Sequence, residues 1–115
     1  MTDLSDLQKR VVVFRDARDW KQFHSPKDLA LSLVLEAAEL MEHFQWKSPE
    51  EIKKHMKEKN KEVSEELMDV LYWVLLFSHD LQIDIQKEFE YKMDQNEKKY
   101  PVSKAKGSHK KYTEL

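Results

Sequence analysis

Residues 70–77 form an uninterrupted run of eight apolar and aromatic residues, inside a stretch, residues 61–80, that has neither glycine nor proline. A helix with such a middle section has no polar face there, so it has to be covered on most of its sides. One glycine and three prolines in 115 residues, with abundant Leu, Glu and Lys, are typical of helices. The sequence therefore predicts an all-α fold of one domain, which partner subunits complete because so short a chain buries a limited core.

Five helices are expected from N-cap residues and apolar spacing, and they cover about residues 5–20, 26–44, 48–61, 61–80 and 85–100. The expected N-caps are Ser5, Ser25, Ser48 and Asp84. The third helix is polar and is expected to fray near residues 57–61. We expect residues 1–101 to be the helical domain, ended by Pro101, and residues 102–115 to be a basic C-terminal tail. Whether this tail is a mobile, solvated terminus is left open.

Charge and cysteine content exclude several kinds of partner and site. The formal net charge is -2, so no global field favours nucleic-acid polymers or membranes. No apolar run reaches the roughly 20 residues that span a bilayer. The absence of cysteine excludes disulfides and thiolate metal sites, and it fits a reducing compartment. We expect a cytoplasmic protein without nucleic-acid or membrane partners.

Four carboxylates interrupt the apolar helices. Residues 29–41 are apolar except for Ser32, Glu36 and Glu39, so both glutamates have hydrophobic neighbours. Their i, i+3 spacing places both side chains on one helix face, about 5–6 Å apart at Cβ. Glu66 and Asp69 repeat this spacing just before the apolar run. Two antiparallel helices would bring the four acids together.

A cation is expected among these acids, because like charges about 4 Å apart repel by ~4 kcal/mol at an effective dielectric of about 20. Neither apolar segment contains Lys or Arg, although a basic residue from another helix remains an alternative partner. Carboxylate oxygens suit Mg²⁺ or Mn²⁺, and Mg²⁺ keeps positions for water and substrate phosphates. The pattern predicts a Mg²⁺ site, with Mn²⁺ as a substitute, and favours phosphate chemistry.

The four acids also allow other interpretations. A di-iron bundle needs Glu-x-x-His on two helices, but His43 and His55 follow Glu39 and Glu51 by four residues, and we expect both histidines on polar faces. The glutamates could also reach solvent or pair with basic residues elsewhere. A different functional class is a non-enzymatic helical interaction module with an acidic binding face, which predicts no metal dependence.

Several motifs resemble the MazG-like all-α nucleoside triphosphate pyrophosphohydrolases, most closely the dCTP pyrophosphatase branch. The metal motif is Glu36-x-x-Glu39, a gap of 26 residues, then Glu66-x-x-Asp69. The other similar segments are residues 18–20, 22–24, 44–48, 92–94, 96, 100–101 and 111–115. The resemblance therefore covers almost the whole chain. It implies a MazG-like bundle of four to five helices, completed as a homotetramer of paired dimers.

The resemblance also implies the reaction. A nucleoside triphosphate, either dCTP or a modified, noncanonical deoxynucleotide, would be hydrolysed between its α- and β-phosphates to the monophosphate and pyrophosphate, which suits sanitation of the nucleotide pool. Glu39, or else Glu36, would take the proton of the attacking water, and Glu36, Glu39, Glu66 and Asp69 would hold Mg²⁺. Val11 stands where the vertebrate enzymes have a nucleotide-contacting His, and Trp73 where they have a Tyr. The resemblance therefore implies the reaction more directly than it implies which base the enzyme prefers.

Residues that bind the nucleotide are expected in two groups. The resemblance assigns the nucleoside pocket to Trp20, Lys21, Gln22, Phe23, His24, Trp46 and Trp73. Tryptophan rings can stack on a base, although packing in the core is the alternative. On the last long helix, Lys92, Asn96 and Lys99 share a face and offer donors to phosphate oxygens, with a solvated charged face as the alternative.

Overall fold

The structure, a computed structural model, describes residues 2–115, and every regular element in this range is a helix. The elements are α1 (Leu4–Ala17), η1 (Lys21–Phe23), α2 (Pro26–Glu42), α3 (Pro49–Asp80), α4 (Ile85–Lys99), α5 (Val102–Ala105) and η2 (Tyr112–Glu114). They form two compact units that divide after Gln82. The all-α prediction is confirmed. No helix in residues 2–115 is long and apolar enough to cross a membrane.

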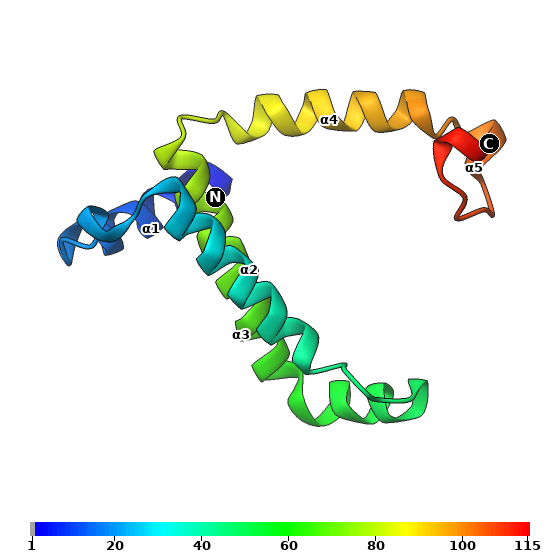
Figure 1. Ribbon diagram of the computed structural model, residues 1–115, viewed down its shortest axis with the longest axis horizontal. Helices are drawn as coiled ribbons and strands as arrows, with labels where there is room; N and C mark the ends of the chain where they lie inside the picture. The colour runs from blue at the N-terminus through cyan, green and yellow to red at the C-terminus, as the bar shows by residue number, and fades with distance from the viewer. Residues whose placement is uncertain (1) are drawn as a thin grey trace. The chain divides into compact units, whose positions relative to one another are not determined.

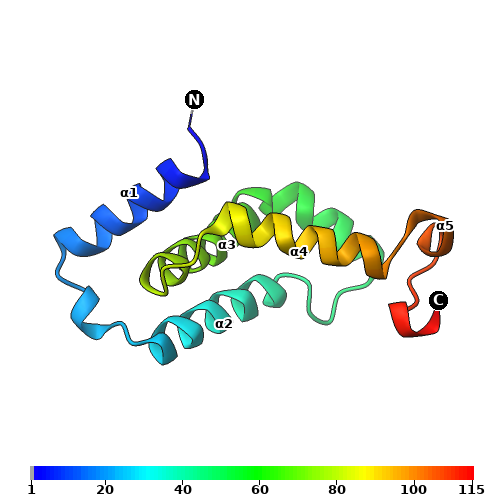
Figure 2. The same ribbon diagram turned by 90° about the horizontal axis from the view of Figure 1, so that it is seen from above.

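The first unit is built around the hairpin of α2 and α3. In Figures 1 and 2, α2 lies beside the second half of α3 and runs in the opposite direction, and α1 packs against α3. The buried apolar core of this unit consists of Leu29, Val63, Leu75 and Leu76. This arrangement places the i, i+3 acids of α2 opposite those of α3.

Much apolar surface of the same hairpin remains exposed within one chain. The exposed side chains include Leu31, Val34 and Leu35 on α2 and Leu67 and Met68 on α3. Within the apolar run of α3, two leucines are buried, Val74 is exposed, and the other residues are partly buried. A single chain therefore covers this run incompletely, and its completion by partner subunits stays a prediction.

Local signals placed most of the helix starts correctly. Ser25 and Ser48 each form a capping box with the acidic residue three positions later, and the Asp84 side chain accepts a hydrogen bond from the Lys87 backbone. The predicted cap at Ser5 is wrong, because Asp3 caps α1 in a capping box with Asp6. Helix α1 also ends at Ala17 rather than near residue 20.

The third and fourth predicted helices are continuous in the structure as α3. Lys59, inside the segment expected to fray, has φ -121° and ψ 21°, which marks a kink rather than a break. The polar half of α3 therefore continues into the apolar half without a loop.

The second unit contains α4, α5 and η2. Gly107 has φ 77°, a left-handed conformation that glycine adopts without strain. The rings of Tyr100 and Tyr112 meet edge to face, with their centres 6.1 Å apart. The expected boundary between domain and tail, at residues 101 and 102, falls inside this unit and stays a prediction.

Candidate active site

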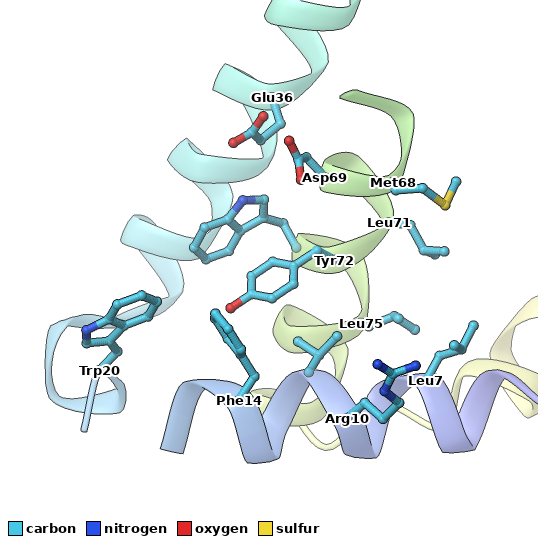
Figure 3. A pocket seen from close by; sticks show the side chains of 12 residues that line it. Leu7, Arg10, Phe14, Trp20, Glu36, Met68, Asp69, Leu71, Tyr72 and Leu75 are labelled. Carbon is cyan, nitrogen blue, oxygen red and sulfur yellow. The ribbon is translucent and has the colours of Figure 1, made fainter. Parts of the chain in front are cut away.

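Three of the four predicted carboxylates meet between α2 and α3. One carboxylate oxygen from each of Glu36, Glu39 and Glu66 lies within 4.8 Å of the others. Asp69 is exposed one turn further along α3, and its charge acts on both Glu36 and Glu66. Figure 3 shows the carboxylates of Glu36 and Asp69 on the two facing helices. The hairpin thus gathers acids from segments about 30 residues apart in the sequence.

Two of these carboxylates are held in unfavourable surroundings. The Oε2 atoms of Glu36 and Glu66 are buried, and neither has a hydrogen-bond partner. Burial, followed by the contact with Glu39, raises the pKa of Glu36 to about 7 from its usual 4.5. Burial and Glu39 also raise the pKa of Glu66. No ion pair found in residues 2–115 neutralises any of the four acids.

The donor set fits a hard divalent cation. Closely spaced carboxylate oxygens without protein partners are what Mg²⁺ or Mn²⁺ takes as ligands, whereas a structural zinc site uses sulfur and nitrogen. A cation would also offset the repulsion that, after burial, contributes to raising the pKa values of Glu36 and Glu66. Glu36, Glu39 and Glu66 could hold it, with Asp69 close by.

A largely apolar cavity of about 660 Å³ adjoins the acids. Its lining consists of Leu7, Arg10, Val11, Phe14, Trp20, Glu36, Met68, Asp69, Leu71, Tyr72, Trp73 and Leu75. Figure 3 shows the acids at one end and the aromatic rings of Phe14 and Tyr72 further along. This volume lies in the range of small-molecule sites. The two lining acids lie at one end, and Arg10 lies away from them near Leu7 (Figure 3). The cavity can therefore take a molecule with a flat apolar part and a strongly anionic part that reaches a cation.

The aromatic side chains of the cavity support one another. The Phe14 ring meets Trp20 at 5.8 Å and Tyr72 at 6.3 Å, and Tyr72 meets Trp73 at 5.1 Å, all in edge-to-face arrangements. The Arg18 guanidinium lies 3.8 Å from the centre of the Phe14 ring and donates a hydrogen bond to the Phe14 carbonyl. The wall formed by α1 is thus held in place by contacts of its own.

His24 contacts Trp73. Its ring meets Trp73 edge to face at 5.5 Å, and its buried Nδ1 has no hydrogen-bond partner. Burial, and then the positive charge of Arg15, lowers the pKa of His24. His24 and Lys21 line a smaller cavity of about 330 Å³ rather than the aromatic one.

The other predicted binding residues are more dispersed. Gln22 donates hydrogen bonds to Asp19, Phe23 is 65% exposed, and Trp46 is 91% exposed with φ 66°. None of these three lines the aromatic cavity. Lys92, Asn96 and Lys99 lie on α4, in the second unit. Their roles stay predictions.

Several lining residues were not singled out from the sequence. Phe14 lies in the first predicted helix and Tyr72 in the apolar run, and neither was expected to line a site. The buried Arg15 follows Val11 by four residues, so helical spacing placed it on the inner stripe and could have marked it. The expectation of His43 and His55 on polar faces is also wrong, because both are partly buried and contact each other.

Comparisons with known proteins match both the sequence and the fold. The MazG-like family matches residues 31–115. The dCTP pyrophosphatase 1 of Rattus norvegicus is 39% identical over 114 residues, which cover 97% of this chain and 67% of the rat protein. That of Homo sapiens is 38% identical over 114 residues, with 97% and 67% covered. The crystal structure of a pyrophosphatase from Archaeoglobus fulgidus has a TM-score of 0.80 and 37% identity, over 88% of this chain and 94% of that chain.

Proposed function

Since this chain belongs to the MazG-like family, we propose that it is a nucleoside triphosphate pyrophosphohydrolase, which hydrolyses its substrate to the monophosphate and pyrophosphate. The names of its relatives, dCTP pyrophosphatase and pyrophosphatase, support this enzyme class. They give no support to a non-enzymatic interaction module.

The observation that carries the proposal is the position of the carboxylate cluster at one end of an aromatic cavity. Glu36 and Glu66 each keep a buried oxygen without a partner, and Trp20, Tyr72 and Trp73 line the cavity beside Glu36. A nucleoside triphosphate has the complementary form, because its base is flat and apolar while its phosphates require a cation. The base would occupy the aromatic part, and the phosphates would face the acids.

Glu36, Glu39, Glu66 and Asp69 are the proposed ligands of Mg²⁺, with Mn²⁺ as a substitute. When bound, the ion would neutralise phosphate oxygens, orient the leaving pyrophosphate and lower the pKa of water. One carboxylate oxygen of Glu36 and one of Glu66 are buried without a hydrogen-bond partner, so both are available as ligands for the ion.

Glu39 is the proposed proton acceptor for the attacking water, with Glu36 as the second candidate. Glu39 is exposed, so water can reach it, and it contacts both partly buried glutamates. A carboxylate in this position can hold the proton that water loses as it attacks the α-phosphorus.

Further residues are proposed to contact the nucleoside and the phosphates. Trp20 and Trp73 would enclose the base, and Trp73 is also in edge-to-face contact with His24. We keep Lys21, Gln22, Phe23 and Trp46 as nucleoside contacts, and Lys92, Asn96 and Lys99 as phosphate contacts.

We propose deoxycytidine triphosphate, or a base-modified or otherwise noncanonical deoxynucleotide, as the substrate. The named activity of the relatives supports this choice. We also propose a homotetramer of paired dimers, which the exposed apolar side chains of α2 and α3 support. A cytoplasmic location stays a prediction.

Pyrophosphate release from a panel of common and modified nucleoside triphosphates, with and without Mg²⁺, tests the function. We expect the greatest release with deoxycytidine substrates and none without the metal. In ¹⁸O-labelled water the label should appear in the monophosphate. Label in pyrophosphate would mean attack at the β-phosphorus, and release of single phosphate would indicate a different reaction.

A further inference from the structure

His43 and His55 form a pair that the proposed reaction does not use. His43 lies at the C-terminal end of α2, and His55 lies in the part of α3 before its kink. The Nδ1 atom of His43 and the Nε2 atom of His55 are 2.9 Å apart. Both side chains are partly buried, so neither is fully shielded from solvent.

The two rings are also held by an aromatic neighbour. Phe44 contacts both imidazoles, with ring centres 6.4 Å from each, and the two imidazole centres are 5.1 Å apart. Two ring nitrogens from different helices therefore face each other beside a shared aromatic neighbour. Such preorganisation is what a metal site requires of its ligands.

The separation of the two nitrogens suits a shared ion. Nitrogens that each lie about 2.0–2.1 Å from one ion are about 2.9 Å apart at the right angles of a square-planar Cu²⁺ site and about 3.3–3.4 Å apart in a tetrahedral Zn²⁺ site, so Zn²⁺ requires the pair to open by about 0.4–0.5 Å. The hydrogen bond now between them needs a proton on one of the two facing atoms. Moving that proton to the other nitrogen of the same ring frees both facing lone pairs without a net release of protons.

We propose that His43 and His55 form a second metal site, which binds a late first-row divalent ion such as Zn²⁺ or Cu²⁺ and cross-links the end of α2 to the first half of α3. Imidazole nitrogens favour these ions, whereas Mg²⁺ prefers oxygen. Water would complete the coordination. The site is distinct from the carboxylate cluster, whose members in the structure are all glutamates, and it does not rest on the proposed function.

The charges around His55 bear on how readily it binds a cation. Burial lowers the pKa of His55, and the positive charges of Lys47 and Lys59 and its neighbour His43 lower it further, while Glu58 opposes them. A neutral ring, ready to act as a ligand, is favoured at neutral pH. The same lysines repel a second cation, so we expect moderate affinity.

Calorimetric titration of the full chain with Zn²⁺, in excess Mg²⁺ to occupy the carboxylates, tests the site. We expect one Zn²⁺ per chain. His43→Gln and His55→Gln should each weaken binding at least about tenfold, because each removes one of two protein ligands. His109→Gln is the matched control, since His109 is exposed in the second unit. Equal Zn²⁺ binding by wild type and both variants would overturn the proposal.

Two further measurements distinguish the histidine site from the carboxylate cluster. The second uses the wild-type protein, so it does not require any variant to fold. Glu36→Gln with Glu66→Gln should keep the Zn²⁺ site, and loss of binding in that protein would place the ion at the carboxylates instead. Electron paramagnetic resonance of the wild-type protein with one Cu²⁺ should show hyperfine splitting from imidazole nitrogens. A spectrum of oxygen ligands alone would contradict the site.

Discussion

Arg15 donates two hydrogen bonds to the carboxylate of Asp80, 2.6 and 2.9 Å long, across 65 residues of sequence. The Arg15 side chain is completely buried, and that of Asp80 is 14% exposed. Burial alone would raise the pKa of Asp80, but the bonds and charge of Arg15 lower it overall. The pair ties α1 to the last residue of α3 and thereby holds Phe14, the neighbour of Arg15, against the cavity.

Breaking this ion pair from one side should destabilise the fold. Arg15→Met leaves the Asp80 carboxylate without its partner, and Asp80→Asn leaves the buried guanidinium paired only with the half-exposed Asp16. We expect the free energy of unfolding, measured in urea, to fall by about 3–5 kcal/mol in each. Glu58→Gln, which breaks an exposed pair with Lys54, is the control and should change it by less than about 1 kcal/mol. Similar losses in all three would show that burial of the pair does not matter.

Neutralising the acids should remove activity without unfolding the protein. Glu36→Gln, Glu39→Gln, Glu66→Gln and Asp69→Asn should each lower turnover at least roughly 100-fold, because each removes charge that holds the cation at the phosphates. Glu65→Gln is the matched control, since it is an exposed neighbour of Glu66 on α3. Turnover and thermal melts are measured together. A fully active variant, or one that is inactive only through unfolding, would count against the assignment.

The stability of the metal-free protein should depend on pH through Glu36. Its pKa is about 7 in the folded chain, above its usual 4.5, so the folded state binds the proton more tightly than the unfolded state. This stabilisation is complete below about pH 4.5 and is lost as pH rises through 7, with a slope of up to about 1.4 kcal/mol per pH unit.

Melting temperatures from pH 5 to 8.5 in a chelator should therefore fall, and saturating Mg²⁺ should flatten the decline. Glu36→Gln should make the decline shallower, because one titrating group is gone and Glu66, whose pKa is also raised, remains. A stability that rises over this range in the metal-free wild type would contradict the raised pKa.

Replacing Trp73 and replacing Trp46 should have different effects on nucleotide affinity and on melting temperature. Trp73→Ala should weaken nucleotide binding by about 1–3 kcal/mol and also lower the melting temperature, because Trp73 lines the cavity and contacts Tyr72 and His24. Trp46→Ala should lower affinity by a similar amount without loss of stability, since its side chain is 91% exposed. Titration of dCTP and dTTP, with a melt beside each, measures both effects. Unchanged affinity in the Trp46 variant would remove it from the pocket.

Much of the fold was readable from local sequence because its signals act over three or four residues. Ser25 and Ser48 start helices through capping boxes that need only the residue three positions later. The same geometry puts Glu36 beside Glu39 on one face of a helix. Family resemblance then supplied the reaction, which helix geometry alone does not contain.

What only the tertiary structure decided was which faces meet, and at what level along the hairpin. Helical spacing says that Glu66 and Asp69 share a face, but the register of α3 against α2 brings Glu66 into the cluster and leaves Asp69 at its edge. The same register joins His43 to His55, and the packing of α1 on α3 joins Arg15 to Asp80. These contacts depend on side chains 12 to 65 residues apart, and their partners are selected by packing of whole helices, which no local pattern specifies.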